Sequence, residues 1–186
     1  MSKTGRILFQ MALFASFGTL MFLSDIAMEA LPNIHLIGMF TVTFTVVYRY
    51  KALIPLYVYV FLNGVYGGFS SWWIPYLYVW AVLWGMAMLL PKRMHPAVAT
   101  FVYMAVAGLH GLMFGTLYAP SQVLLFFGGD FSKMVPWIIS GLPFDVMHCI
   151  GNVFAGILIL PLVKALTSLH KRVPIAPNKR TLGNKS

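Results

Sequence analysis

Long apolar stretches recur along the whole 186-residue chain, separated by short segments that carry proline, glycine or charge. A helix needs about 20 apolar residues to cross the hydrocarbon core of a bilayer. Six stretches approach or exceed that length, the second being the shortest: residues 7–29, 34–48, 52–69, 73–90, 97–118 and 134–163. With 60% hydrophobic and 9% charged residues, the chain has too few polar side chains to cover a soluble domain. We therefore expect an all-α, polytopic membrane protein, a bundle of six transmembrane helices.

The basic residues indicate how this bundle is oriented. If the N-terminus lies in the cytoplasm, 12 of the 13 lysines and arginines fall in cytoplasmic segments and only Lys133 falls outside. An even number of spans then places both termini in the cytoplasm. The net charge of +9 is explained by these juxtamembrane positions, so we expect no nucleic-acid partner. Residues 1–170 should form a single six-helix transmembrane domain, and residues 171–186 a basic, disordered cytoplasmic tail.

The stretch GLPFDVMHCIGN, residues 141–152, places polar groups inside the last apolar run. Asp145, His148 and Asn152 are spaced i, i+3, i+7, so they share one face of a helix. This face descends from the outer end of the span toward the middle of the bilayer, at about 1.5 Å per residue. Polar groups at such depth either line a cavity or bond a neighbouring helix, because facing lipid is costly. The first alternative predicts a ligand site.

The fourth apolar stretch carries a comparable row of aromatic rings. Trp73, Tyr76, Trp80 and Trp84 follow the spacing i, i+3, i+7, i+11 along one helix face. Such a row could form a stacking wall for a flat ligand, because aromatic faces bind heterocycles. Packing against neighbouring helices explains the same pattern, and the sequence leaves both interpretations open.

Other polar residues are expected near the same outer side of the bundle. Apolar walls with a few placed polar groups are typical of a small-ligand pocket. The residues that we predict to bind substrate are Trp73, Tyr76, Trp80, Asp145, His148, Asn152, Asn63, Glu29 and Asn33.

Several catalytic classes are disfavoured by the sequence. The single cysteine, Cys149, excludes an internal disulfide and a CxxC zinc or redox motif. Ser140 and His148 lack the G-x-S-G pattern of an intramembrane serine protease. A metal or haem site needs matched ligands, and His110 has no second ligand one turn away. No G-x-x-x-x-G-K-[ST] loop is present, so ATP hydrolysis would need a partner. We expect no enzyme activity, cofactor or metal.

The first apolar stretch carries a face of small residues, and small residues let helices approach closely within a membrane. Small-xxx-small spacing is a common helix-packing signal, so it only weakly indicates a partner protein. The residues that we predict to bind a partner are Ala12, Ala15, Ser16 and Thr19.

In these features the chain resembles the substrate-binding S components of energy-coupling factor (ECF) vitamin transporters. The resemblance rests on the six-span pattern and on MALFAS (11–16), LPNIH (31–35), GLPFDVMHCIGN (141–152) and LPLVKAL (160–166). It implies a membrane-embedded binding protein that works with a transmembrane T component and two cytoplasmic ATPases. It also implies an A-x-x-x-A docking pattern in the first span, of which Ala12 matches the first position while Ser16 replaces the second alanine.

The resemblance and the residues together predict an S component of an ECF-type ABC importer in the bacterial plasma membrane. It would capture a small water-soluble vitamin or precursor from outside for ATP-driven uptake. The ligand should be flat and nitrogen-containing, for example a pyrimidine such as hydroxymethylpyrimidine. One alternative is a stand-alone secondary carrier or channel for a small polar solute, which would not co-purify with ATPases. A second is a membrane enzyme or haem protein, and a visible absorption spectrum tests for haem.

Overall fold

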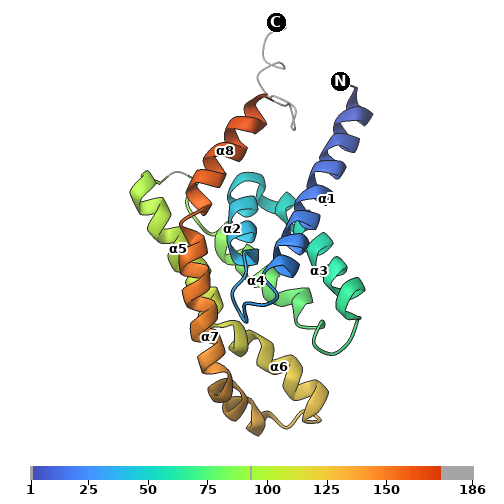
Figure 1. The fold of residues 1–186 in the computed structure, drawn as a ribbon, viewed down its shortest axis with the longest axis vertical. Coiled ribbons are helices and arrows are strands. Elements are labelled where there is room, and N and C mark those ends of the chain that lie inside the picture. The colour runs from blue at the N-terminus through green and yellow to red at the C-terminus, as the bar shows by residue number, and fades with distance from the viewer. Residues whose placement is uncertain (1, 93, 173–186) are drawn as a thin grey trace, which may run out of the picture.

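The computed structural model describes residues 2–92 and 94–172 (Figure 1). The regular secondary structure of these residues is helical and includes no β-strand, so the all-α prediction is confirmed. The helices are α1 (Lys3–Ala27), α2 (Ile37–Tyr48), the 3-10 helix η1 (Arg49–Ala52), α3 (Leu53–Gly67), α4 (Tyr76–Met88), α5 (Pro96–Leu112), α6 (Phe114–Phe126), the 3-10 helix η2 (Phe131–Lys133), α7 (Met134–Gly156) and α8 (Ile159–Arg172). Residues 173–186, most of the predicted basic tail, lie outside the described part of the chain.

Three helical stretches are long and apolar enough to cross a membrane. They are Thr4–Ala27, Pro96–Phe126 and Phe131–Gly156. The apolar helices α4 and α8 are shorter, and α2 has 12 residues, a length of about 18 Å. The structure is compatible with a membrane bundle, and the six crossings stay a prediction.

Helix α2 is the central element of the bundle. It contacts α1, α4, α5, α7 and α8, and most of its residues are buried. Its sequence, IGMFTVTFTVVY, has no charged residue, and its polar side chains are threonines and the terminal Tyr48. Thr45 donates a 2.6 Å hydrogen bond to the carbonyl of Thr41, so this hydroxyl is satisfied within the helix. A helix that is apolar on every side belongs in the interior, and α2 lies there.

The fifth predicted span, 97–118, is not one helix. Helix α5 ends at Leu112, and α6 begins at Phe114 and turns away from the α5 axis (Figure 1). In an uninterrupted helix the amide of Gly115 would bond the carbonyl of Gly111. This amide instead donates a 2.8 Å hydrogen bond to Oδ1 of Asp145 in α7. The side chain of Asp145 thus caps the start of α6, and the sequence pattern of the single segment gave no sign of it.

The sixth predicted span, 134–163, is also divided, between α7 and α8. Pro161 lies in the first turn of α8. Proline has no amide hydrogen, and its ring clashes with the carbonyl four residues earlier, here that of Ile157. The break between Gly156 and Ile159 therefore has a local cause.

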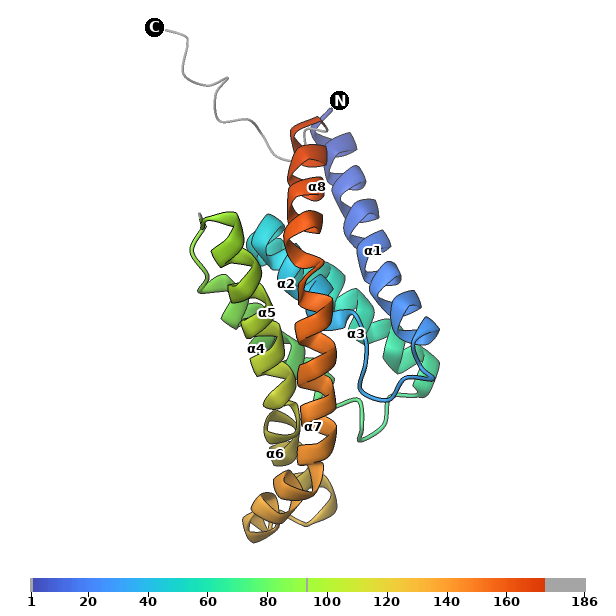
Figure 2. The same cartoon turned by 60° about the vertical axis from the view of Figure 1, so that its left-hand side comes forward.

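The two ends of the bundle differ. The start of α1 and the end of α8 lie at one end, while α6 and the start of α7 lie at the other (Figures 1 and 2). Helix α7 runs along α5, and α1 packs on α3. At Gly18 of α1 an added Cβ would lie 2.5 Å from Cβ of Val58, so only glycine permits this approach. The end formed by α6 and α7 holds the first candidate site.

Candidate functional site

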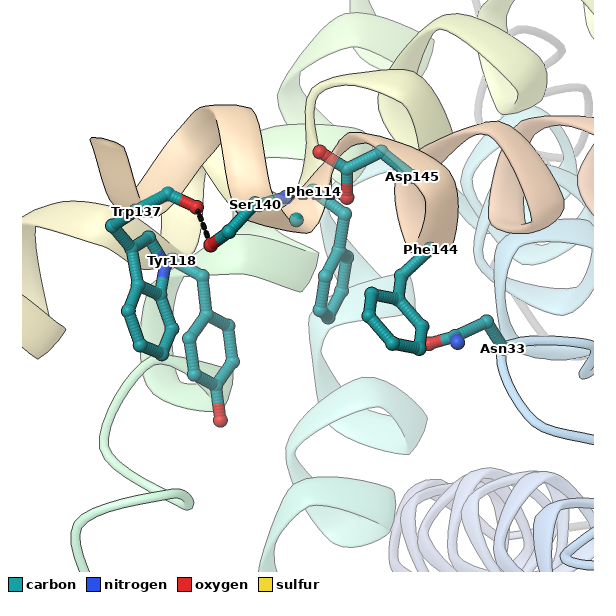
Figure 3. A pocket seen from close by; sticks show the side chains of 9 residues that line it. Asn33, Phe114, Tyr118, Trp137, Ser140, Phe144 and Asp145 are labelled. Carbon is teal, nitrogen blue, oxygen red and sulfur yellow. Dashed lines mark hydrogen bonds between the residues drawn. The ribbon is translucent and has the colours of Figure 1, made fainter. Parts of the chain in front are cut away.

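A cavity of about 250 Å³ opens between α6, α7 and the segment that joins α1 to α2 (Figure 3). It lies at the end of the bundle opposite the start of α1. The residues that line it are Asn33, Phe114, Gly115, Tyr118, Trp137, Ser140, Gly141, Phe144 and Asp145. Of the residues predicted to bind substrate, the cavity brings together Asn33 and Asp145.

Aromatic rings form most of the cavity wall. Phe114 and Tyr118 are one turn apart on α6, and their rings stack at 5.6 Å with an interplanar angle of 27°. Trp137 and Phe144 are two turns apart on α7, and both side chains line the cavity (Figure 3). The hydroxyl of Ser140 donates a 2.7 Å hydrogen bond to the carbonyl of Trp137. The walls therefore offer ring faces to a ligand and few free polar atoms.

These four aromatic residues were missed as site residues in the sequence. A signal was present, because Trp137, Gly141 and Phe144 precede Asp145 at helical spacing. Phe114 and Tyr118 carried no comparable signal. They reach the cavity only because α6 separates from α5, and that separation depends on a contact with α7.

Asp145 is the acidic residue of the cavity and is only 3% exposed. Its Oδ1 accepts the Gly115 amide, while its Oδ2 is buried without a hydrogen-bond partner in the described residues. Gly115 is necessary for this arrangement, since an added Cβ would lie 2.6 Å from Oδ2. A buried carboxylate oxygen normally has a hydrogen-bond partner, so Oδ2 is an unmet acceptor beside the cavity.

Beneath the cavity lies a second layer, which we call the inner cluster: His35, Trp80, His110 and His148. Phe114 connects the two layers, because its ring centroid is 4.6 Å from that of His148 and 5.5 Å from that of Trp80. The ring of His148 is also 4.5 Å from that of His35. The fully buried Trp80 stands at the centre of the cluster and has ring contacts with all three histidines.

The inner cluster holds several unpaired polar atoms. Nε1 of Trp80, Nδ1 of His110 and Nε2 of His148 are buried, and the described part of the chain offers none of them a hydrogen-bond partner. The other ring nitrogen of His110, Nε2, lies 3.0 Å from the carbonyl of Val79. An unsatisfied buried donor or acceptor costs about 1–3 kcal/mol. An unpaired tryptophan nitrogen beside two unpaired histidine nitrogens is typical of a site that a polar ligand or water completes.

The polar face of α7 is oriented inward, and its members have different surroundings. Asp145, His148 and Asn152 are all buried. Nδ2 of Asn152 donates a 3.0 Å hydrogen bond to the carbonyl of Ala107, which joins α7 to α5. An added Cβ on Gly38 would lie 2.8 Å from Oδ1 of Asn152, so α2 also packs against this amide. Asn152 thus has a helix-packing role, and its contact with substrate stays a prediction.

The aromatic row of α4 and the preceding turn does not form one wall. Nε1 of Trp73 donates to the carbonyl of Val60 at 2.7 Å, and Nε1 of Trp84 donates to that of Arg49 at 3.2 Å. These bonds tie the two tryptophans to α3 and η1, as the packing interpretation predicted. Tyr76 contacts the inner cluster, with its ring 6.0 Å from that of Trp80.

Two further predicted residues, Glu29 and Asn63, lie at a different cavity. This second cavity, of about 270 Å³, is lined by Asp25, Ile26, Glu29, Asn63, Tyr66, Gly67 and Trp72. The hydroxyl of Tyr59 donates a 3.0 Å hydrogen bond to Oδ2 of Asp25. The predicted substrate residues are therefore distributed between two cavities, the inner cluster and packing positions.

No group of three or more histidine, cysteine or acidic side chains placed to hold a metal ion occurs in residues 2–92 and 94–172. Comparisons with protein-family models, with curated proteins and with solved structures find no match to this chain. The arrangement can hold a flat molecule between aromatic rings and supply one free carboxylate oxygen. The ring nitrogens of the inner cluster lie beyond Phe114, which separates them from the cavity.

Proposed function

We propose that this protein is the membrane-embedded substrate-binding S component of an ECF-type ABC importer. It captures a small water-soluble vitamin or vitamin precursor from outside the cell for uptake driven by ATP hydrolysis in partner subunits. The observation that carries the proposal is the buried, half-satisfied carboxylate of Asp145 in an aromatic-walled cavity. A binding protein of this kind needs a concave, mostly apolar site with a few placed polar groups.

The outer surface of the bundle supports a membrane location. Large apolar side chains are exposed on several helices, among them Phe101 at 72% and Phe154 at 67%. In water, a broad apolar surface of this kind would drive association. A bilayer removes that penalty, because lipid tails are as apolar as these side chains.

The distribution of charge supports an outward-facing site. Of the basic residues that the structure describes, Lys133 in η2 lies at the cavity end, and the others lie near the start of α1, at η1, before α5 and on α8, at or toward the opposite end of the bundle (Figures 1 and 2). By the positive-inside rule the basic end is cytoplasmic, and the cavity then faces outside, where it meets its substrate.

The face of α1 that points away from the bundle supports a transmembrane partner. Ala12, Ala15, Ser16 and Thr19 are all exposed, whereas Gly18 is buried against α3. The hydroxyl of Thr19 donates a 3.0 Å hydrogen bond to the carbonyl of Ala15, so this hydroxyl is satisfied within the helix. Small exposed residues let a second helix approach closely, as docking on a T component requires.

Purification from the native host in mild detergent, followed by native mass spectrometry, tests the proposal. We expect a bound small molecule and co-purifying T component and ATPase subunits. Ala12→Trp should abolish co-purification of these subunits, because an indole on this face prevents close helix contact. The matched control is Ala105→Trp, which places the same side chain on the exposed face of α5. A protein that carries its ligand but never an ATPase would instead favour the secondary carrier.

A further inference from the structure

The aromatic cavity has an electrostatic character that restricts its ligand. Asp145 is the ionisable acid among its lining residues, and within the described chain no lysine or arginine lines the cavity. Oδ2 of Asp145 has no hydrogen-bond partner among the described residues, and the residue is only 3% exposed, so a ligand in the cavity reaches this oxygen only when the side chains around it give way. A carboxylate oxygen accepts hydrogen bonds and offers none when ionised.

One backbone contact offsets part of the cost of burying a charge on this carboxyl group. Gly115 is the second residue of α6, and its amide donates to Oδ1 of Asp145. The amides of the first turn carry the positive end of a helix dipole, which stabilises a negative charge placed there. The charge of Asp145 is therefore supported by α6 on one oxygen, while the other oxygen remains for the ligand.

The walls independently favour a positive charge. Phe114, Tyr118, Trp137 and Phe144 line the cavity with aromatic rings. Ring faces carry partial negative charge and attract cations within about 6 Å of the ring centroid. The same faces stack on flat molecules. A flat cation gains from both properties, whereas a flat anion would meet negative potential from the rings and from Asp145.

We infer that the ligand of this cavity is a flat cation with N–H donors on its charged edge, of the amidinium or protonated aminoheterocycle class. Its N–H edge donates to Oδ2 of Asp145 and its ring lies against the aromatic walls. This inference rests on the proposed function, because it identifies the ligand class of the same site. It goes beyond that function in excluding carboxylate ligands, which many vitamins are.

Three isosteric probes test this ligand class: benzamidine, benzamide and benzoate. They share one ring and carry charges of about +1, 0 and −1 at neutral pH. Binding to the purified protein in detergent is measured by equilibrium dialysis. Because charge-assisted hydrogen bonds are the stronger ones, we expect benzamidine to bind at least about tenfold more tightly than benzoate, with benzamide between them.

Substitution locates the effect. Asp145→Asn keeps an amide oxygen for the Gly115 amide and removes the charge, so benzamidine should lose about tenfold in affinity while benzamide changes little. Asp130→Asn is the matched control, since Asp130 is an exposed carboxylate whose bonds from Ser132 lower its pKa. This control should not alter the preference for benzamidine. Glu29→Gln removes an acid from the other cavity and so shows which of the two cavities holds the cation.

Several outcomes would overturn the ligand class. Two results with the wild-type protein would each contradict the proposed ligand class. One is that benzoate binds as tightly as benzamidine, and the other is that benzamidine does not bind at millimolar concentration. An equal loss in Glu29→Gln and none in Asp145→Asn would place the cation in the second cavity. Each of these results leaves co-purification with ATPases intact, so it separates failure of the ligand class from failure of the transport proposal.

Discussion

Replacement of Gly111 by alanine tests the contact that holds α5 against α7. An added Cβ at Gly111 would lie 2.9 Å from backbone atoms of His148 and Cys149. Backbone cannot rotate aside as a side chain can, so the two helices must separate by about 0.5 Å to reach ordinary contact. Overpacking of this kind costs about 1–3 kcal/mol, and the better helix propensity of alanine returns at most about 1 kcal/mol. We expect a net loss of about 1–2 kcal/mol.

The assay is thermal unfolding in mild detergent, monitored by tryptophan fluorescence. For a chain of this size, 1 kcal/mol corresponds to about 2–4 °C, so Gly111→Ala should lower Tm by about 2–8 °C. Gly85→Ala is the matched control, because an added Cβ there meets nothing within 4 Å. It should raise Tm slightly, through helix propensity alone. If the two variants unfold at the same temperature, α5 and α7 do not approach at Gly111 as described.

Three further substitutions test the site and its surroundings. Asp145→Leu should lower the free energy of unfolding by about 1–3 kcal/mol, because the amide of Gly115 loses its acceptor. Thermal unfolding of Asp145→Leu is compared with that of Asp145→Asn, which keeps an acceptor. Equal Tm values for the two variants would refute the capping role of Asp145. His148→Phe removes the unpaired Nε2 atom, so it should raise the Tm of the ligand-free protein by about 2–4 °C and weaken binding of the natural ligand. A lowered Tm would mean that Nε2 of His148 has a hydrogen-bond partner. Tyr59→Phe should cost about 1 kcal/mol by removing the bond to Asp25, as denaturant titration would show, and an unchanged midpoint would contradict that bond.

Much of the local organisation was determined by the sequence. The lack of polar side chains led to an all-helical chain, and the short breaks located most helix ends. Spacing alone placed Asp145, His148 and Asn152 on one inward face of α7, because the helical period depends only on backbone geometry. Polar groups are driven to the inside of an apolar bundle by the cost of exposing them to lipid, and this too needs no knowledge of neighbours.

Tertiary structure decided which of these residues share a site. Glu29 and Asn63 lie at one cavity, Asp145 and Asn33 at another, and Asn152 is bonded to α5. The cavity that holds Asp145 and Asn33 depends on how α6 leaves α5, and the hydrogen bond from the Gly115 amide to Asp145 holds the start of α6 against α7. A hydrogen bond between residues 30 positions apart leaves no periodic trace in the sequence. The pattern of the chain therefore determined most helix ends and the inward face of α7, while tertiary contacts divided the fifth predicted span and the packing of α6 on α7 created the cavity.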